Sequence, residues 1–275
     1  MIDVNRRVLP GFQLSLSYTL VYLSLLVLIP LTACFIKAAS LSWGEFVAAV
    51  WTERARAAYT LSVGASLVAA AINVPIGVLI AWVLVRYRFP GKRLFDSLID
   101  LPFALPTAVA GLVYSSLYVE SGWLGRYLVP LGIYGSYSRF AIVLVLTFIT
   151  LPFIVRTVQP ILEDFESEIE EAAACLGANR VQTFLRVIMP ALLPAIITGF
   201  ALAFARGLGE YGSVVFVSGN MPYKTEIAPV LIVSQLEGFN YPQAAAVAVV
   251  LLIISFSMLV VINLLERWSK GHGSY

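Results

Sequence analysis

The stretch that decides the fold is Glu171-Ala-Ala-Ala-Cys-Leu-Gly177, followed after nine residues by Val187-Ile-Met-Pro190. Six acids precede or begin it within the nine positions 163–171, so this part of the chain faces water. Ser167-Glu-Ile-Glu170 has the spacing of a capping box and predicts a helix that begins at Glu168. Gly177 suits the left-handed backbone position that ends such a helix.

A second short helix is predicted after Gly177. Val181, Phe184, Leu185 and Ile188 recur at helical spacing and form one apolar stripe. Pro190 is expected to end this helix, because proline lacks the N–H that would continue the hydrogen-bond ladder. Residues 163–190 therefore form a compact polar loop with two helices.

The rest of the chain is far too apolar for a water-soluble domain. It is 60% hydrophobic and 12% charged, and its mean hydropathy is +0.88. Runs of this length and polarity predict transmembrane helices. We expect an all-α, polytopic membrane protein in which residues 1–275 form a single domain. The six expected spans lie near residues 14–36, 58–85, 101–119, 140–158, 191–217 and 244–265.

Orientation follows from the basic residues, which concentrate in cytoplasmic loops. An arrangement with both termini and the loop 163–190 in the cytoplasm places most Lys and Arg on that side. These residues are Arg6, Arg7, Arg86, Arg88, Lys92, Arg93, Arg156, Arg180, Arg186, Arg267 and Lys270.

Two proline-containing segments lie at the start of the third expected span, one before it and one within it. Arg86-Tyr-Arg-Phe-Pro-Gly-Lys-Arg93 is a tight basic turn, which is either an anchor for topology or a contact for a partner. Leu101-Pro-Phe-Ala-Leu-Pro106 opens the span with two prolines, which either bend a helix entrance or shape a gate.

Arg206 is the ionisable residue buried deepest in an expected span. It lies about 22 Å into a hydrocarbon core of about 30 Å. An arginine there needs a partner or a wet cavity. Glu210, four residues later, offers an ion pair. The alternative is that the guanidinium faces the pathway of a tetrahedral oxyanion.

The sequence lacks the residues that several other classes of function require. The net charge of +2 gives no reason to expect nucleic-acid binding. No phosphate-binding loop, Gly-x-Ser-x-Gly or His-Glu-x-x-His occurs, and His272 is the only histidine. Cys34 and Cys175 are predicted to lie apart and unpaired. We expect no catalytic residue, metal site or cofactor on this chain. An intramembrane enzyme and a secondary transporter remain the other classes considered.

The loop 163–190 resembles the EAA loop of ABC importer permeases. Glu171, Ala172, Ala173, Gly177 and Pro190 match the family pattern, and Leu176 lies within it; Val187 and Met189 replace an Ile and a Leu of that pattern. The resemblance implies that these residues dock on a separate ATPase and couple ATP hydrolysis to transport. A secondary transporter would not require such a loop.

Longer stretches resemble the sulfate/thiosulfate permeases of type I ABC importers, specifically their T subunits. The resemblance rests on 7–12, 86–91, 100–111, 152–160 and 206–210, which occur in the family's order. It implies an inner-membrane importer with a dimeric ABC ATPase that holds ATP and Mg, a second W-type permease and a periplasmic sulfate-binding protein. Molybdate or tungstate is the alternative solute.

Overall fold

The computed structural model describes residues 11–271, with side chains to residue 264, and that part of the chain contains helices and no strand. Arg6 and Arg7, and the side chains of Arg267 and Lys270, lie outside the described part. Their contribution to the predicted orientation therefore stays a prediction.

Five continuous helical stretches are long and apolar enough to cross a membrane. They overlap the first, second, fourth, fifth and sixth expected spans. In chain order they are α1 (Phe12–Leu23) with η1 (Ser24–Leu28) and α2 (Ile29–Ala39), then α4 (Glu53–Arg86), α9 (Arg139–Glu163), α11 (Arg180–Thr183) with η3 (Phe184–Ile188) and α12 (Met189–Leu208), and α15 (Tyr241–Gly271).

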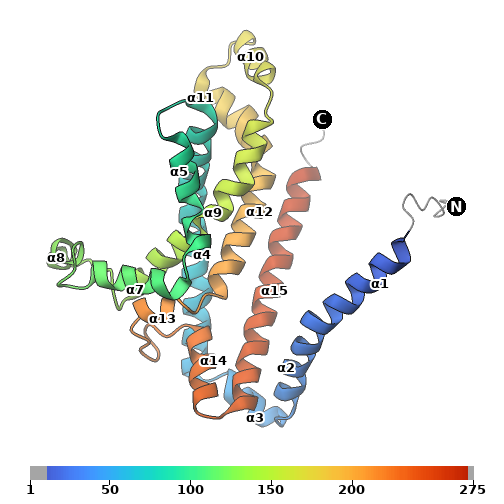
Figure 1. Cartoon of the computed structure of the whole chain (residues 1–275), viewed down its shortest axis with the longest axis vertical. Helices are drawn as coiled ribbons and strands as arrows, with labels where there is room; N and C mark the ends of the chain where they lie inside the picture. Colours follow the sequence, from blue (N-terminus) through green and yellow to red (C-terminus); the bar gives the residue numbers. More distant parts are fainter. Residues whose placement is uncertain (1–10, 272–275) are drawn as a thin grey trace.

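The third expected span, 101–119, is not one helix. After α5 (Lys92–Ile99), the chain forms α6 (Leu101–Ala104) and α7 (Thr107–Tyr118) instead, and α7 runs sideways from the bundle (Figure 1). Leu105 has extended backbone angles, φ −82° and ψ 134°. Pro106 causes this break, because a proline disfavours helical geometry in the residue before it.

The predicted bounds of the fifth span, 191–217, are wrong at both ends. Its helical stretch begins at Arg180 and stops at Leu208, and a short α13 (Val214–Val217) follows a turn. Glu210 stabilises that turn, because its carboxylate accepts hydrogen bonds from the backbone N–H and the hydroxyl of Ser213, at 2.9 and 3.0 Å. The carboxylate thus satisfies donors that a continuing helix would have used.

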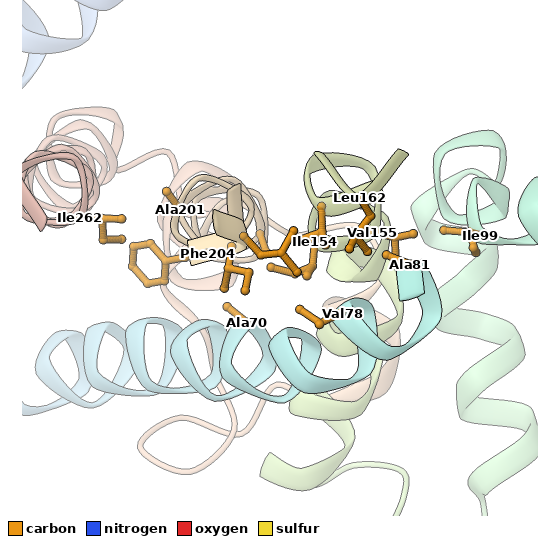
Figure 2. Packing of buried hydrophobic residues seen from close by; sticks show 14 of the residues in the cluster. Ala70, Val78, Ala81, Ile99, Ile154, Val155, Leu162, Ala201, Phe204 and Ile262 are labelled. Carbon is orange, nitrogen blue, oxygen red and sulfur yellow. The ribbon is translucent and has the colours of Figure 1, made fainter. Parts of the chain in front are cut away.

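The core lies where α4, α9 and α12 pack together (Figure 2). Buried side chains such as Val78, Ile154 and Phe204 fill it. Glycines permit the close approach: a Cβ on Gly77 would lie 2.6 Å from Ile154, and one on Gly199 would lie 2.3 Å from Thr157. Small residues serve this purpose at helix contacts in membranes.

Most of the remaining elements lie at the two ends of the bundle. Helix α10 (Ser167–Cys175) and the turn between α4 and α5 lie at one end, and α3 (Trp43–Val50) and α14 (Ala228–Glu237) lie at the other (Figure 1). A lateral segment with α8 (Gly125–Leu128) and η2 (Val129–Leu131) follows α7. The side of the membrane that each end faces remains as predicted from the basic residues.

Candidate functional site

The end of α10 has the geometry that the sequence predicts. Gly177 has a φ of +85°, in the left-handed region. The N–H of Ala178 donates to the carbonyl of Ala173 at 3.0 Å, and the N–H of Gly177 donates to that of Ala174 at 2.9 Å. These two bonds define a Schellman motif, which fixes the direction in which the chain leaves the helix.

The start of α10 differs from the prediction. The helix begins at Ser167, with Glu166 as its N-cap, and no side chain caps it. The expected capping box is therefore wrong. Glu170 does not reach back to the helix start, because its carboxylate forms an ion pair with Arg86, the last residue of α4.

Arg86 and Glu170 belong to a group of four side chains that we call the base cluster: Trp82, Arg86, Glu170 and Phe184. The guanidinium of Arg86 lies over the Trp82 ring, 5.3 Å from its centroid. The same ring meets the edge of Phe184 at a centroid distance of 5.4 Å. The cluster therefore joins α4 to both α10 and η3.

The second helix of the loop continues directly into the membrane-spanning helix. Asn179 and Gln182 form a reciprocal capping box at its start. Pro190 does not end it, contrary to the expectation. The turn just before Pro190 is a π-helix, η3, and η1 stands in the same position before Pro30. A widened turn accommodates the proline ring and its missing N–H without breaking the helix.

The predicted apolar stripe of this second helix divides into two faces. Phe184 and Ile188 point into the protein, where Ile188 is 2% exposed. Val181 and Leu185 are exposed, and Leu176 at the end of α10 is 89% exposed. The loop thus presents apolar side chains outward.

The matched residues of the EAA pattern lie on α10, on the turn that ends it and at the start of α12. Glu171, Ala172 and Pro190 are exposed, and Ala173 is buried against the protein. Cys175 is also exposed. The arrangement leaves the first turns of the motif accessible to a second molecule.

Arg206 and Glu210 form the predicted ion pair. The helix ends at Leu208, so Arg206 occupies the last turn of α12, where the negative end of the helix dipole favours a positive charge. Glu210 is 2% exposed, whereas the side chain of Arg206 is 36% exposed. Within residues 11–271, Glu210 is the hydrogen-bond partner of Arg206.

The turn that carries Glu210 packs tightly on α7. A Cβ on Gly212 would lie 2.3 Å from the Thr107 hydroxyl oxygen, and one on Gly111 would lie 2.3 Å from the Ser213 carbonyl oxygen. The broken third span and the turn after α12 therefore fit together without room for a side chain at Gly111 or Gly212.

Arg156 anchors α5, the helix that precedes the broken span. Its Nε and Nη2 donate to the two carboxylate oxygens of Asp100 at 2.8 and 2.6 Å, and its Nη1 donates to Asp96 at 2.7 Å. Further bonds reach the Asp96 carbonyl and Gln159. This bidentate geometry ties α5 to α9.

In the described part of the chain, no three His, Cys, Asp or Glu residues are placed to hold a metal ion. The expected absence of a metal site remains a prediction.

Residues 73–271 match the family described as "Binding-protein-dependent transport system inner membrane component". The chain is 51% identical over 255 residues to the sulfate transport system permease protein CysT of Synechococcus elongatus, covering 93% of this chain and 92% of that one. It is 47% identical to the protein of the same name from Synechocystis sp., covering 93% and 90%.

Solved structures share the architecture. A bacterial alginate ABC transporter in complex with an alginate pentasaccharide-bound periplasmic protein has a TM-score of 0.76 to this chain at 17% identity, covering 93% of both chains. At this identity the likeness is one of fold. It confirms that an all-α chain with this helix arrangement has the fold of ABC importer permeases.

Proposed function

Because the chain belongs to the family of binding-protein-dependent transport system inner membrane components, we propose that it is the permease subunit of an ATP-driven sulfate/thiosulfate importer. The observation that carries the proposal is its 47 to 51% identity, over nearly the whole chain, to sulfate permeases. The chain is a transport subunit and not an enzyme. ATP hydrolysis belongs to a partner.

The geometry of the loop 163–190 supports coupling to an ABC ATPase. Leu176 offers an exposed apolar side chain beside a rigid Schellman turn at Gly177. Exposed apolar side chains on a polar loop favour burial against another protein. Glu171 and Ala172 are accessible on α10. The base cluster holds α10 against the end of α4 through the Arg86–Glu170 ion pair.

In the proposed assembly, this chain has three kinds of protein partner in addition to the lipid bilayer. A dimeric ATPase binds ATP and Mg and contacts the loop 163–190. A W-type permease supplies the facing wall of the pathway, and a periplasmic sulfate-binding protein delivers the solute. The structural neighbour bound to a periplasmic protein supports a soluble partner of this kind. The proposed location is the bacterial inner membrane, with both termini cytoplasmic.

Arg206 is the proposed pathway residue. Its side chain is one-third exposed and points from the end of α12, close to the turn that packs on α7. Glu210 neutralises part of the charge of Arg206. The affinity of this site for the anion is therefore low enough for the anion to be released. A planar guanidinium with free N–H groups suits a tetrahedral oxyanion.

Reconstituted vesicles test the proposal. The chain, the W-type permease and the ATPase are placed in liposomes with binding protein and labelled sulfate, thiosulfate or molybdate. Sulfate or thiosulfate uptake that needs Mg-ATP and stops with vanadate supports the function. Uptake of molybdate alone would assign the alternative solute, and uptake without ATP would indicate a secondary transporter.

A further inference from the structure

A hollow of about 490 Å³ opens on the outside of the bundle between α4, α5 and α9. Every side chain that lines it is apolar. The lining consists of Leu79, Ile80, Val83, Leu84, Phe89, Phe95, Leu98, Ile99 and Leu151. A hollow with such walls in a membrane-spanning region suits a hydrocarbon chain, because water would leave its hydrogen bonds unmade there.

The position of the hollow along α4 matches the part of one lipid leaflet that lies next to the headgroups. Its wall on α4 extends from Leu79 to Leu84, and α4 ends at Arg86. The distance along the helix from Leu79 to Arg86 is about 10 Å. A leaflet contributes about 15 Å to the hydrocarbon core. The hollow therefore begins just below the polar interface.

Basic residues belong to the same segment as several of the lining side chains. The turn after α4 and the first turn of α5 carry Arg88, Lys92 and Arg93. Phe89 and Phe95, which line the hollow, lie close to these residues in the chain, and their rings contact each other at a centroid distance of 5.9 Å. The apolar wall and the positive charges thus belong to one short segment.

Positive charge is in excess around this segment. Glu170 pairs with Arg86, and Asp96 and Asp100 share Arg156, which leaves one negative charge on that group. No ion pair between described side chains involves Arg88, Lys92 or Arg93. Their three charges therefore exceed the one remaining negative charge, and the N-terminus of α5, which has no side-chain cap, adds to the positive potential.

We propose that this hollow binds an anionic phospholipid. One acyl chain lies in the hollow, and the phosphate lies on Arg88, Lys92 and Arg93. An apolar wall beside an excess of positive charge is the complement of a lipid with a negative headgroup. The bound lipid braces α5 against α4, beside the base cluster.

Native mass spectrometry of the full-length chain, purified in detergent, tests the site. The probes are palmitoyl-oleoyl phosphatidylglycerol and, for comparison, palmitoyl-oleoyl phosphatidylcholine. The wild type should retain phosphatidylglycerol preferentially. The triple variant R88Q/K92Q/R93Q should bind it at least about tenfold more weakly, with phosphatidylcholine binding unchanged.

A charge control and a shape variant separate specific binding from general attraction. R56Q/R126Q removes two basic groups remote from the hollow and should bind as the wild type does. Leu79→Trp fills the hollow and keeps every charge, and it should lose phosphatidylglycerol as well. Circular dichroism and a single elution peak verify that each variant is folded.

Two results would overturn the proposal. In the first, the triple variant retains as much phosphatidylglycerol as the wild type. In the second, Leu79→Trp binds it normally, which would leave a basic surface without an acyl site.

Discussion

The carboxylate of Glu170 in α10 is paired with the guanidinium of Arg86, which ends α4 and precedes it by 84 residues. This contact fastens the proposed ATPase-docking helix to the second membrane-spanning helix of the chain. A push on α10 therefore reaches α4 directly, as well as α9 and α12 through the backbone.

Glu170→Gln should lower ATP-driven sulfate uptake several-fold with little change in the melting temperature. The pair is partly exposed, and such pairs stabilise by about 1 kcal/mol or less. A loss of transport at nearly constant stability therefore indicates positioning. Uptake and thermal unfolding are measured together, with Glu168→Gln as the control on the same helix. The double variant R86E/E170R should regain part of the uptake, and no recovery would argue against the pair.

Gly177→Val should uncouple ATP hydrolysis from transport. A β-branched residue at a φ of +85° is strained by about 1 to 2 kcal/mol, which favours loss of the Schellman turn. The protein should still insert in the membrane while solute-stimulated ATPase activity falls. Gly44→Val is the matched control, because Gly44 has open space and an ordinary helical backbone. Normal stimulation in Gly177→Val would contradict the role of the turn.

Arg206→Lys should reduce sulfate uptake while leaving assembly intact, because the charge remains and the planar fork is lost. The double variant R206Q/E210Q removes the ion pair but leaves an acceptor for Ser213. Uptake is measured in vesicles, and assembly by co-purification of the subunits. Full uptake in the double variant would reduce Arg206 to a structural role.

Arg156→Lys should destabilise the protein by about 1 to 3 kcal/mol, because one ammonium cannot replace hydrogen bonds to Asp96, Asp100 and Gln159 together. The drop should appear as a lower melting temperature in detergent. Arg126→Lys, at a site without an ion pair in the described residues, serves as the control and should leave it unchanged.

Cys175 reports on orientation. It is exposed on α10, whereas the Cys34 thiol lies 4.0 Å from the carbonyl of Ala245. A membrane-impermeant maleimide should label Cys175 in inside-out vesicles and not in intact spheroplasts. The Cys175→Ser variant identifies the labelled site. Labelling from the outside would reverse the predicted topology.

Local chemistry made several elements predictable. Gly177 is predictably left-handed because few other residues adopt that conformation readily, and the apolar runs predict the long helices to within a few residues except for the one that ends at Leu208. The Arg206 and Glu210 pair followed from spacing alone, although the helix between them ends earlier than predicted.

The errors came from interactions that the sequence does not display. Glu170 was assigned to a capping box because its true partner, Arg86, is remote in the chain. Pro190 was expected to stop a helix because π turns have no sequence signal that distinguishes them from α turns. The prolines at 102 and 106 predict either a bend or a gate, and the structure shows that the second one ends the helix before α7, which runs sideways.

The π turn at η3 also sets the direction in which the loop 163–190 projects around the axis of α12. A π turn contains one residue more than an α turn, and each helical residue contributes about 100° of rotation. Removing one residue from 184–188 would restore a regular α-helix and rotate everything before it by about that angle. Leu176 and Glu171 would then face a different direction although no docking residue had changed. The extra residue therefore sets the angle between the part of the chain that is proposed to contact the ATPase and the part that crosses the membrane.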